Sequence, residues 1–299
     1  MRYRISHATT YQYRPAVTDG YTLAYLLPRP TPEQTVESAE VVVEPVPDTR
    51  AEHVDVFGNL ALQFGVHRRH DALSVRAISD VVVSRPGVPL PGPAWEDVAA
   101  TVGELRGGEA LTVRPFAAAS PYVPLDLQGG ALRAMAGETF TPGRPVIDAT
   151  RDLCTLIYET FAYDPTFTDV STPMSTILAA RRGVCQDFAH VAAGCLRSVG
   201  LAARYVSGYL GTNGPRRQGA GASHAWSSVW VPDASSELGA WVDFDPTNDL
   251  LPADHHVTVA WGRDYGDVAP MRGVIIGPGS KQDLDVSVEI TSEQPTSPL

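Results

Sequence analysis

The segment Gly183-Val184-Cys185-Gln186-Asp187-Phe188-Ala189-His190 constrains the fold of this chain most. Apolar residues follow Cys185 at helical spacing, and Gly200 supplies a stop, so a helix is predicted to begin at the cysteine. The apolar positions are Phe188, Val191, Ala192, Cys195 and Val199. The dipole and unpaired amides of a helix's first turn favour a negatively charged sulfur, and the thiolate is the nucleophilic form. The segment therefore predicts a reactive cysteine rather than a packing one.

The other two cysteines lack this setting. Cys154 lies in the predicted helix 145–161 beside an apolar stripe, and Cys195 lies on the apolar face of the helix that follows Cys185. Free cysteine is commonly buried as a small hydrophobe, so we expect both thiols in the core. Three cysteines without a Cys-x-x-Cys pair predict neither a zinc site nor a disulfide framework.

A histidine and an aspartate follow in the order that a nucleophilic triad needs. His224 precedes an alternating, aromatic-rich run at 225–231, which predicts a strand, and Asp245 ends a second predicted strand at 241–245 before Pro246. An aspartate in that place can accept the second imidazole N–H and stabilise the imidazolium. Asp243 shares a face with Asp245 in strand alternation, so periodicity does not choose between them.

These segments resemble the transglutaminase-like superfamily. The resemblance rests on Gly183-Val184-Cys185, on Ser223-His224-Ala225-Trp226 and on Trp241-Val242-Asp243-Phe244-Asp245-Pro246-Thr247. It extends to residues 3–13, 55–59 and 262–268, which look like the outer parts of bacterial two-domain members. The resemblance selects Asp245 over Asp243 and implies a Cys185-His224-Asp245 catalytic triad. The backbone amide of Cys185 is an expected oxyanion donor because it lies at the helix start, and Tyr163, Asp187 and Trp226 are candidate oxyanion-site or supporting residues.

The order of predicted elements indicates an α+β fold with two lobes. Alternating strand patterns fill residues 1–90 and predict an N-terminal β-sandwich. Residues 91–126 are less regular and are predicted to be a linker that contains a short helix. Residues 127–290 predict a papain-like, transglutaminase-like core with helices packed on an antiparallel sheet, and 291–299 a flexible tail. The late strands near 273–276 and 284–290 could complete that sheet or return to the first lobe.

The triad predicts acyl transfer from an amide through a thioester. With water as the acceptor the enzyme is a peptidase or amidase; with an amine it is a transglutaminase. We favour water because the sequence shows no dedicated amine site. Arylamine N-acetyltransferase fits the Trp-x-x-x-Asp-Pro-Thr segment and the β-rich N-terminal region poorly. An inactive transglutaminase-like binding scaffold is the alternative from another class.

Neither a metal nor another cofactor is expected. His255-His256 follows Asp254 in a predicted loop, and adjacent histidines do not easily converge on an ion, so we interpret the pair as solvated. The sequence also lacks an EF-hand-like calcium loop.

A net charge of −11 argues against nucleic acid and anionic membranes as partners. A peptide or protein amide is the expected substrate, and the oligomeric state stays open. The first residues lead into a strand pattern rather than an apolar segment, so we expect no signal peptide. A reactive thiol beside two core cysteines suits a reducing cytoplasm.

Overall fold

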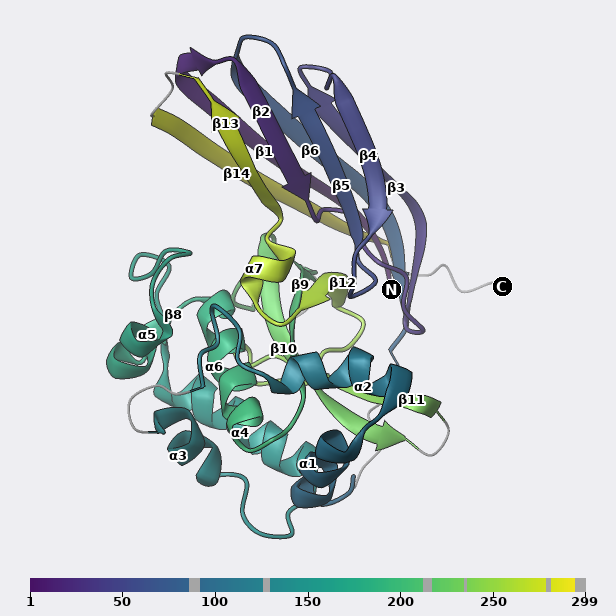
Figure 1. The fold of residues 1–299 in the computed structure, drawn as a ribbon, viewed down its shortest axis with the longest axis vertical. Helices are drawn as coiled ribbons and strands as arrows, with labels where there is room; N and C mark the ends of the chain where they lie inside the picture. Colours follow the sequence, from purple (N-terminus) through teal and green to yellow (C-terminus); the bar gives the residue numbers. More distant parts are fainter. Residues whose placement is uncertain (86–91, 126–129, 212–216, 234–235, 278–280, 294–299) are drawn as a thin grey trace.

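The chain folds into two lobes, a β-sandwich and a mixed lobe of helices and strands (Figure 1). The computed structural model describes residues 1–85, 92–125, 130–211, 217–233, 236–277 and 281–293. This arrangement confirms the predicted α+β fold, with a strand-rich N-terminal region followed by a helix-and-sheet core.

Two four-stranded antiparallel sheets make the sandwich. In spatial order, the first sheet is β14 (Lys281–Glu293), β1 (Arg2–Val17), β6 (His70–Val83) and β3 (Gln34–Glu44). The second is β13 (Met271–Ile276), β2 (Asp19–Ala24), β5 (Leu60–Val66) and β4 (Thr49–Val54).

Strict alternation along β1 explains why it forms a strand with one buried face. Tyr3, Ile5, His7 and Thr9 are buried, while their neighbours are at least partly exposed. Side chains of successive strand residues point to opposite faces, so this pattern lays one face of β1 against the interior of the protein. Val17, Leu62, Phe64 and Val75 belong to the buried cluster between the sheets.

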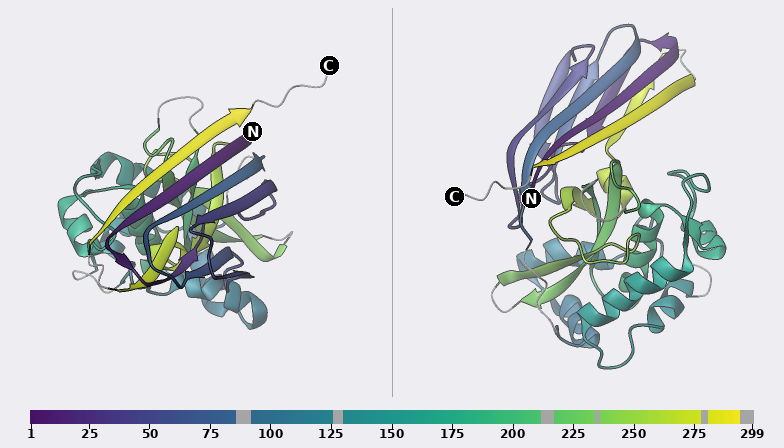
Figure 2. Two further views of the ribbon diagram at one scale, coloured as in Figure 1. Left: turned by 90° about the horizontal axis from the view of Figure 1, so that it is seen from above. Right: turned by 180° about the vertical axis from the view of Figure 1, so that it is seen from behind.

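The last two strands return to the first lobe. β13 pairs with β2 and β14 pairs with β1, so the yellow C-terminal strands lie beside the purple N-terminal ones (Figures 1 and 2). The predicted core at 127–290 therefore differs from the structure after Met271, because long-range strand pairing decides where these residues go. Of the predicted tail, residues 291–293 continue β14, and residues 294–299 lie outside the described residues.

The second lobe places helices around an antiparallel sheet. Its helices are α1 (Trp95–Glu104), α2 (Gly107–Val113), the 3₁₀ helix η1 (Arg114–Ala117), α3 (Ala131–Gly137), α4 (Val146–Thr160), α5 (Met174–Ala180), α6 (Cys185–Ser198) and α7 (Tyr265–Val268). The sheet order is β11 (Ser236–Phe244), β10 (Ser223–Asp233), β9 (Ala203–Leu210) and β12 (His256–Gly262). β7 (Ala162–Tyr163) and β8 (Arg182–Gly183) form a short parallel pair. None of the helices in the described residues has the length and apolarity that a membrane crossing requires.

The expected linker at 91–126 is largely structured between Trp95 and Ala117. Val98 and Val102 of α1, with Val113 and Phe116 further on, are buried in the same apolar cluster as residues of α4 and α6. The sequence lacks a long periodic run here because the burial is shared among short helices. These residues belong to the second lobe by their packing.

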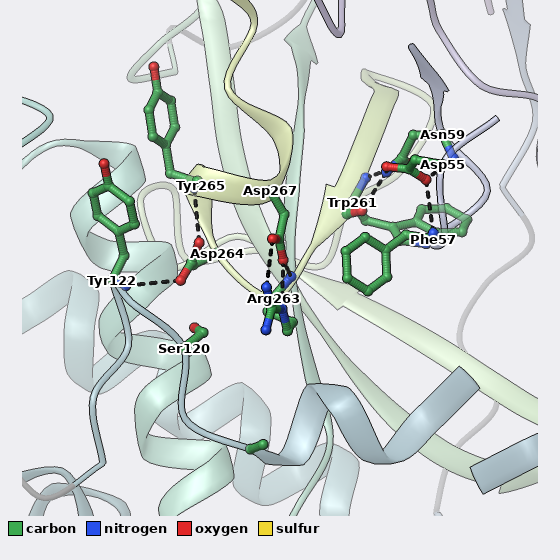
Figure 3. Close-up of polar contacts among 12 residues, drawn as sticks. Asp55, Phe57, Asn59, Ser120, Tyr122, Trp261, Arg263, Asp264, Tyr265 and Asp267 are labelled. Carbon is green, nitrogen blue, oxygen red and sulfur yellow. Dashed lines mark hydrogen bonds and ion pairs between the residues drawn. The ribbon is translucent and has the colours of Figure 1, made fainter. Parts of the chain in front are cut away.

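Apolar and polar contacts join the lobes. One buried cluster combines Tyr3 and Val81 of the sandwich with Tyr205 and Ala225 of the second lobe. The side chain of Asn59 donates to the carbonyl of Trp261 at 2.8 Å and accepts from its N–H at 3.0 Å, as the turn containing Asp55 and Asn59 approaches β12 (Figure 3). The sandwich is therefore bound to β12, an edge strand of the sheet in the second lobe.

Candidate active site

Cys185 begins α6, as the sequence predicts. Val184 is extended at the N-cap, and the Asp187 carboxylate accepts its backbone N–H at 2.8 Å. A Cβ atom at Gly183 would lie 2.5 Å from Asp187 Oδ2, so glycine leaves the space that this carboxylate occupies. The local sequence thus fixes the turn from which the half-buried Cys185 starts the helix.

The structure brings His224 and Asp245 together in the interior. His224 lies on β10, and its Nε2 is 2.8 Å from Asp245 Oδ2, with both side chains fully buried. Cys185 packs against a buried cluster that contains Ala189 of α6 and Ala225 of β10, and Ala225 directly follows His224. Among the described residues, His224 Nδ1 has no hydrogen-bond partner. The imidazole therefore presents one nitrogen to Asp245, and Cys185 lies close enough to the ring to contribute to the pKa of His224.

Both carboxylate oxygens of Asp245 accept hydrogen bonds. Its Oδ2 is 2.8 Å from the amide nitrogen of Asn248 and 3.1 Å from His256 Nε2, in addition to His224. Its Oδ1 accepts the backbone N–H of Thr247 at 2.9 Å. Four nitrogen donors around one buried carboxyl group stabilise the carboxylate over the neutral acid.

The pair has opposite pKa shifts. Burial alone would lower the pKa of His224, but the charge and hydrogen bond of Asp245, with a further contribution from the Cys185 thiol, raise it to about 10. Burial would likewise raise the pKa of Asp245, but the charge and hydrogen bond of His224 and the hydrogen bond of His256 hold it well below its usual range. The favoured state is an imidazolium beside a carboxylate.

Asp243, the alternative to Asp245, forms an ion pair with Arg85. Asp243 Oδ2 accepts from Arg85 Nη1 at 2.7 Å, and its other oxygen accepts from the Ser228 hydroxyl. Burial opposes the ionisation of Asp243, but the charge of Arg85 and the hydrogen bonds that the carboxylate accepts together outweigh it and lower the carboxyl pKa. Asp245, the residue that the motif selects, is the one that contacts His224.

The three predicted supporting residues have different surroundings. Tyr163 is half-buried on β7, and burial, followed by the charge of the nearby Cys185, raises its pKa to about 12. Asp187 caps α6 and also accepts from the Thr168 hydroxyl at 2.8 Å. The buried indole of Trp226 packs against the imidazoles of His224 and His256, with ring centroids 6.2 and 5.1 Å away.

The interpretation of His255-His256 as a solvated pair is wrong for His256. This residue begins β12, is 1% exposed and bonds to Asp245. Three consecutive β-branched residues at 257–259 are the signal in the sequence for a strand that starts there. His255 lies at intermediate burial, with its Nδ1 3.3 Å from the Tyr3 hydroxyl. Asn248, which follows the Asp-Pro-Thr segment and bonds to Asp245, was not among the predicted site residues.

The described part of the loop before His224 covers its imidazole. Gly219 has φ of 80°, and a Cβ atom there would lie 2.6 Å from His224 Nδ1. Asn248 Oδ1 accepts the N–H of Gln218 at 2.8 Å, so the residue that bonds Asp245 also holds this part of the loop. Residues 212–216 of this loop lie outside the described residues.

A cavity of about 470 Å³ adjoins the first turns of α6. Asp187 and His190 line it from the helix, and Tyr122, Pro124, Met174 and Ile177 line it from the facing segments. Burial lowers the pKa of His190 to about 3, so its ring is neutral at physiological pH. The cavity offers a partly open, partly apolar volume of the size that binds small organic groups.

His224, Asp245 and His256 form one group in the described residues that could hold a metal ion, with their ligand atoms within 4.8 Å of one another. Asp245 Oδ2 lies within hydrogen-bond range of both imidazoles and of Asn248. A metal ion would have to replace those protons, so the donor set fits a hydrogen-bonded network better than a resident metal.

Family comparisons match both lobes. A model described as the bacterial transglutaminase-like N-terminal region matches residues 3–82, and a model of the transglutaminase-like superfamily matches residues 133–246. The second match contains Cys185, His224 and Asp245.

Similar chains extend over the whole length. An uncharacterized protein of Mycobacterium tuberculosis is 39% identical over 300 residues, which cover 97% of this chain and 92% of the relative. An uncharacterized protein of Mycobacterium leprae is 34% identical over 297 residues, covering 97% and 98%. The crystal structure of a candidate cysteine protease from Cytophaga hutchinsonii has a TM-score of 0.73 at 22% identity, covering 98% of this chain and 91% of that one. That likeness concerns the fold.

Proposed function

Because the chain belongs to the transglutaminase-like superfamily, we propose that it is a cysteine-dependent amide hydrolase that works through a thioester on Cys185. One observation carries the proposal: the fully buried His224–Asp245 pair at 2.8 Å, whose imidazole interacts with Cys185, the half-buried cysteine at the helix start. A structural role alone does not require an ionised pair in the interior, because burying charges costs free energy.

The proposed reaction uses three groups in two stages. The Cys185 thiolate attacks the amide carbonyl carbon, and the His224 imidazolium gives its Nδ1 proton to the leaving amine as the C–N bond breaks. Water then attacks the thioester while His224 takes up a proton, which releases the acid and returns the sulfur. Asp245 holds the Nε2–H of His224 and stabilises the positive ring throughout.

Attack of the thiolate on the carbonyl carbon places a negative charge on the carbonyl oxygen, and this oxyanion needs hydrogen-bond donors near the sulfur. The backbone N–H of Cys185 lies at the helix start, where amides lack intrahelical partners. Tyr163 is the second donor that we propose. Its raised pKa keeps the hydroxyl protonated, and the contribution of the Cys185 charge to that shift indicates that the two groups are near each other. Asp187 and Trp226 support the site indirectly, by capping α6 and by packing against the two imidazoles.

The proposed substrate is a peptide or protein amide whose side chain enters the cavity beside α6. Water is the proposed acceptor, and a primary amine would make the protein a transglutaminase instead. The net charge of −11 weighs against nucleic acid and anionic membranes as partners. A reducing compartment such as the cytoplasm would keep the nucleophile as a free thiol.

Thiol reactivity tests the nucleophile without a known substrate. Iodoacetamide should label Cys185 first in the native protein, because burial raises the pKa of Cys154 and raises that of Cys195 to about 12. Cys185→Ala should remove the fast labelling and leave the thermal midpoint almost unchanged. Faster labelling of Cys154 or Cys195 would contradict the assignment.

Product analysis tests the reaction. Libraries of peptide amides and γ-glutamyl amides are incubated with the protein, with and without an added primary amine, and the products are identified by mass spectrometry. Cleavage that depends on Cys185 supports the hydrolase. Amine incorporation would indicate a transglutaminase, and an inert Cys185 with no products would indicate a binding scaffold.

A further inference from the structure

His256 is a second imidazole on the carboxylate that orients His224. Its Nε2 is 3.1 Å from Asp245 Oδ2, and the two side chains are 1% and 0% exposed. The ring of Trp226 meets it edge-on, with centroids 5.1 Å apart and an interplanar angle of 82°. A buried histidine so close to the carboxylate has a defined contact and no access to bulk solvent.

The contact defines the tautomer of His256. Asp245 is ionised and can only accept, so the Nε2 that faces it carries the hydrogen. Among the described residues, His256 Nδ1 has no hydrogen-bond partner, and a proton there would be buried without an acceptor. His256 is therefore neutral, and it donates one N–H to Asp245.

The first lobe holds His256 in place through β12. The side-chain amide of Gln34 accepts the N–H of Thr258 at 2.8 Å and donates to its carbonyl at 2.7 Å. Arg85 Nη2 contacts the Thr258 hydroxyl at 3.1 Å and the carbonyl of His256 at 3.4 Å. These contacts fix the backbone at His256 and two residues beyond it, so the imidazole has little freedom to leave Asp245.

We propose that His256 is a positioning residue, whose Nε2–H keeps the Asp245 carboxylate in the orientation that faces His224. This inference rests on the proposed function, since it concerns the same nucleophile. His256 acts only through Asp245 and does not touch the reacting atoms. Without that donor, Oδ2 keeps His224 and Asn248 but loses a partner that prevents the carboxylate from turning.

The experiment measures alkylation of Cys185 by iodoacetamide in the full chain, with the thermal midpoint measured in parallel. His256→Leu removes the N–H and should slow alkylation about tenfold, the lower range for losing a hydrogen bond to a charged group. His256→Gln can place an amide N–H near the former Nε2 and should recover to within about threefold of wild type. His256→Asn carries the same amide on a shorter side chain, cannot reach Asp245 and should be as slow as His256→Leu.

Two controls separate positioning from packing. His255→Leu changes the neighbouring histidine, which contacts Tyr3 rather than Asp245, and should leave the rate unchanged. In an Asp245→Ala background, His256→Leu should cause no further loss, because the residue through which it acts is absent.

Wild-type-like alkylation in His256→Leu, an equally slow His256→Gln, or a full additional loss in the Asp245→Ala background would each overturn the inference. If His256→Leu does not fold, the comparison of His256→Gln with His256→Asn decides. Failure of the proposed function has a different signature: wild-type Cys185 would then react no faster than an ordinary free thiol, whatever residue 256 is.

Discussion

Replacing Asp245 with asparagine removes a negative charge from a carboxyl group that accepts four nitrogen donors. An amide has one acceptor oxygen, so one orientation directs its NH₂ at Thr247 and the other directs it at the histidines and Asn248. The better orientation keeps the oxygen toward His224 and leaves one unfavourable N–H contact. The hydrogen bond to His224 then survives without the charge that stabilises its imidazolium.

The expected loss of activity in Asp245→Asn is large because the pair is buried. His224 and Asp245 are both inaccessible to solvent, so water cannot replace the lost charge. By analogy with other triads, the loss in kcat/KM should be on the order of 10³- to 10⁴-fold. Asp243→Asn instead removes the negative charge that pairs with Arg85, and it leaves the Asp245 contacts in place. It should lower stability by about 2 kcal/mol and change activity little.

The assay compares the two variants by Cys185 alkylation at pH 6 and, once a substrate is known, by kcat/KM. Urea denaturation reports whether each variant is folded under the assay conditions. Equal effects on reactivity would refute the assignment of Asp245. So would a large effect of Asp243→Asn that survives correction for unfolded protein.

Three further predictions concern stability and the loop over the site. Gly219→Ala should slow alkylation of Cys185 more than Gly221→Ala does. Both glycines have φ near 80°, but only the change at Gly219 adds a Cβ 2.6 Å from His224 Nδ1. Equal slowing by the two variants would mean that backbone strain, and not contact with His224, causes the effect. The pKa of His224 in the folded protein is about 10, above the usual 6.5 of a histidine. Its contribution to the free energy of unfolding is therefore complete below pH 6.5 and is lost as pH rises toward 10, which urea titrations at several pH values would detect. Gln34→Leu leaves two buried backbone groups of β12 unpaired and should lower the free energy of unfolding by roughly 3 kcal/mol, whereas Gln63→Leu on the exposed face of β5 should change it by under about 0.5 kcal/mol.

Local signals in the sequence predicted the elements that carry the candidate site. Helical spacing after Cys185 predicts α6, and the alternating runs that contain Ala225 and Trp241 predict β10 and β11. Each signal depends on residues within a few positions of one another, where periodicity and capping act directly. The pairing of Asp245 with His224 came from a motif, because alternation placed Asp243 and Asp245 on one face.

Contacts between distant segments had no such signal. β13 and β14 alternate as any strand does, and nothing in their residues states that their partners are β2 and β1. His256 was interpreted as a loop residue because its polar contact is with Asp245, which lies 11 positions earlier in the chain, just after β11. The short helices between Trp95 and Ala117 were interpreted as a linker because each buries only a few residues.

The contacts at β12 explain why the two lobes form one unit. An edge strand exposes unpaired backbone groups, and β12 has an irregular register near Val259 that leaves more of them without sheet partners. Gln34 and Asn59 of the sandwich satisfy these groups with side-chain amides, which imitate a neighbouring strand without extending the sheet. Because the strand thus covered also carries His256, hydrogen bonds connect the sandwich to the interior of the candidate site, in addition to the apolar contacts between the lobes. The first lobe is therefore part of the structure that holds Asp245, and a substrate-binding role is not needed to explain its presence.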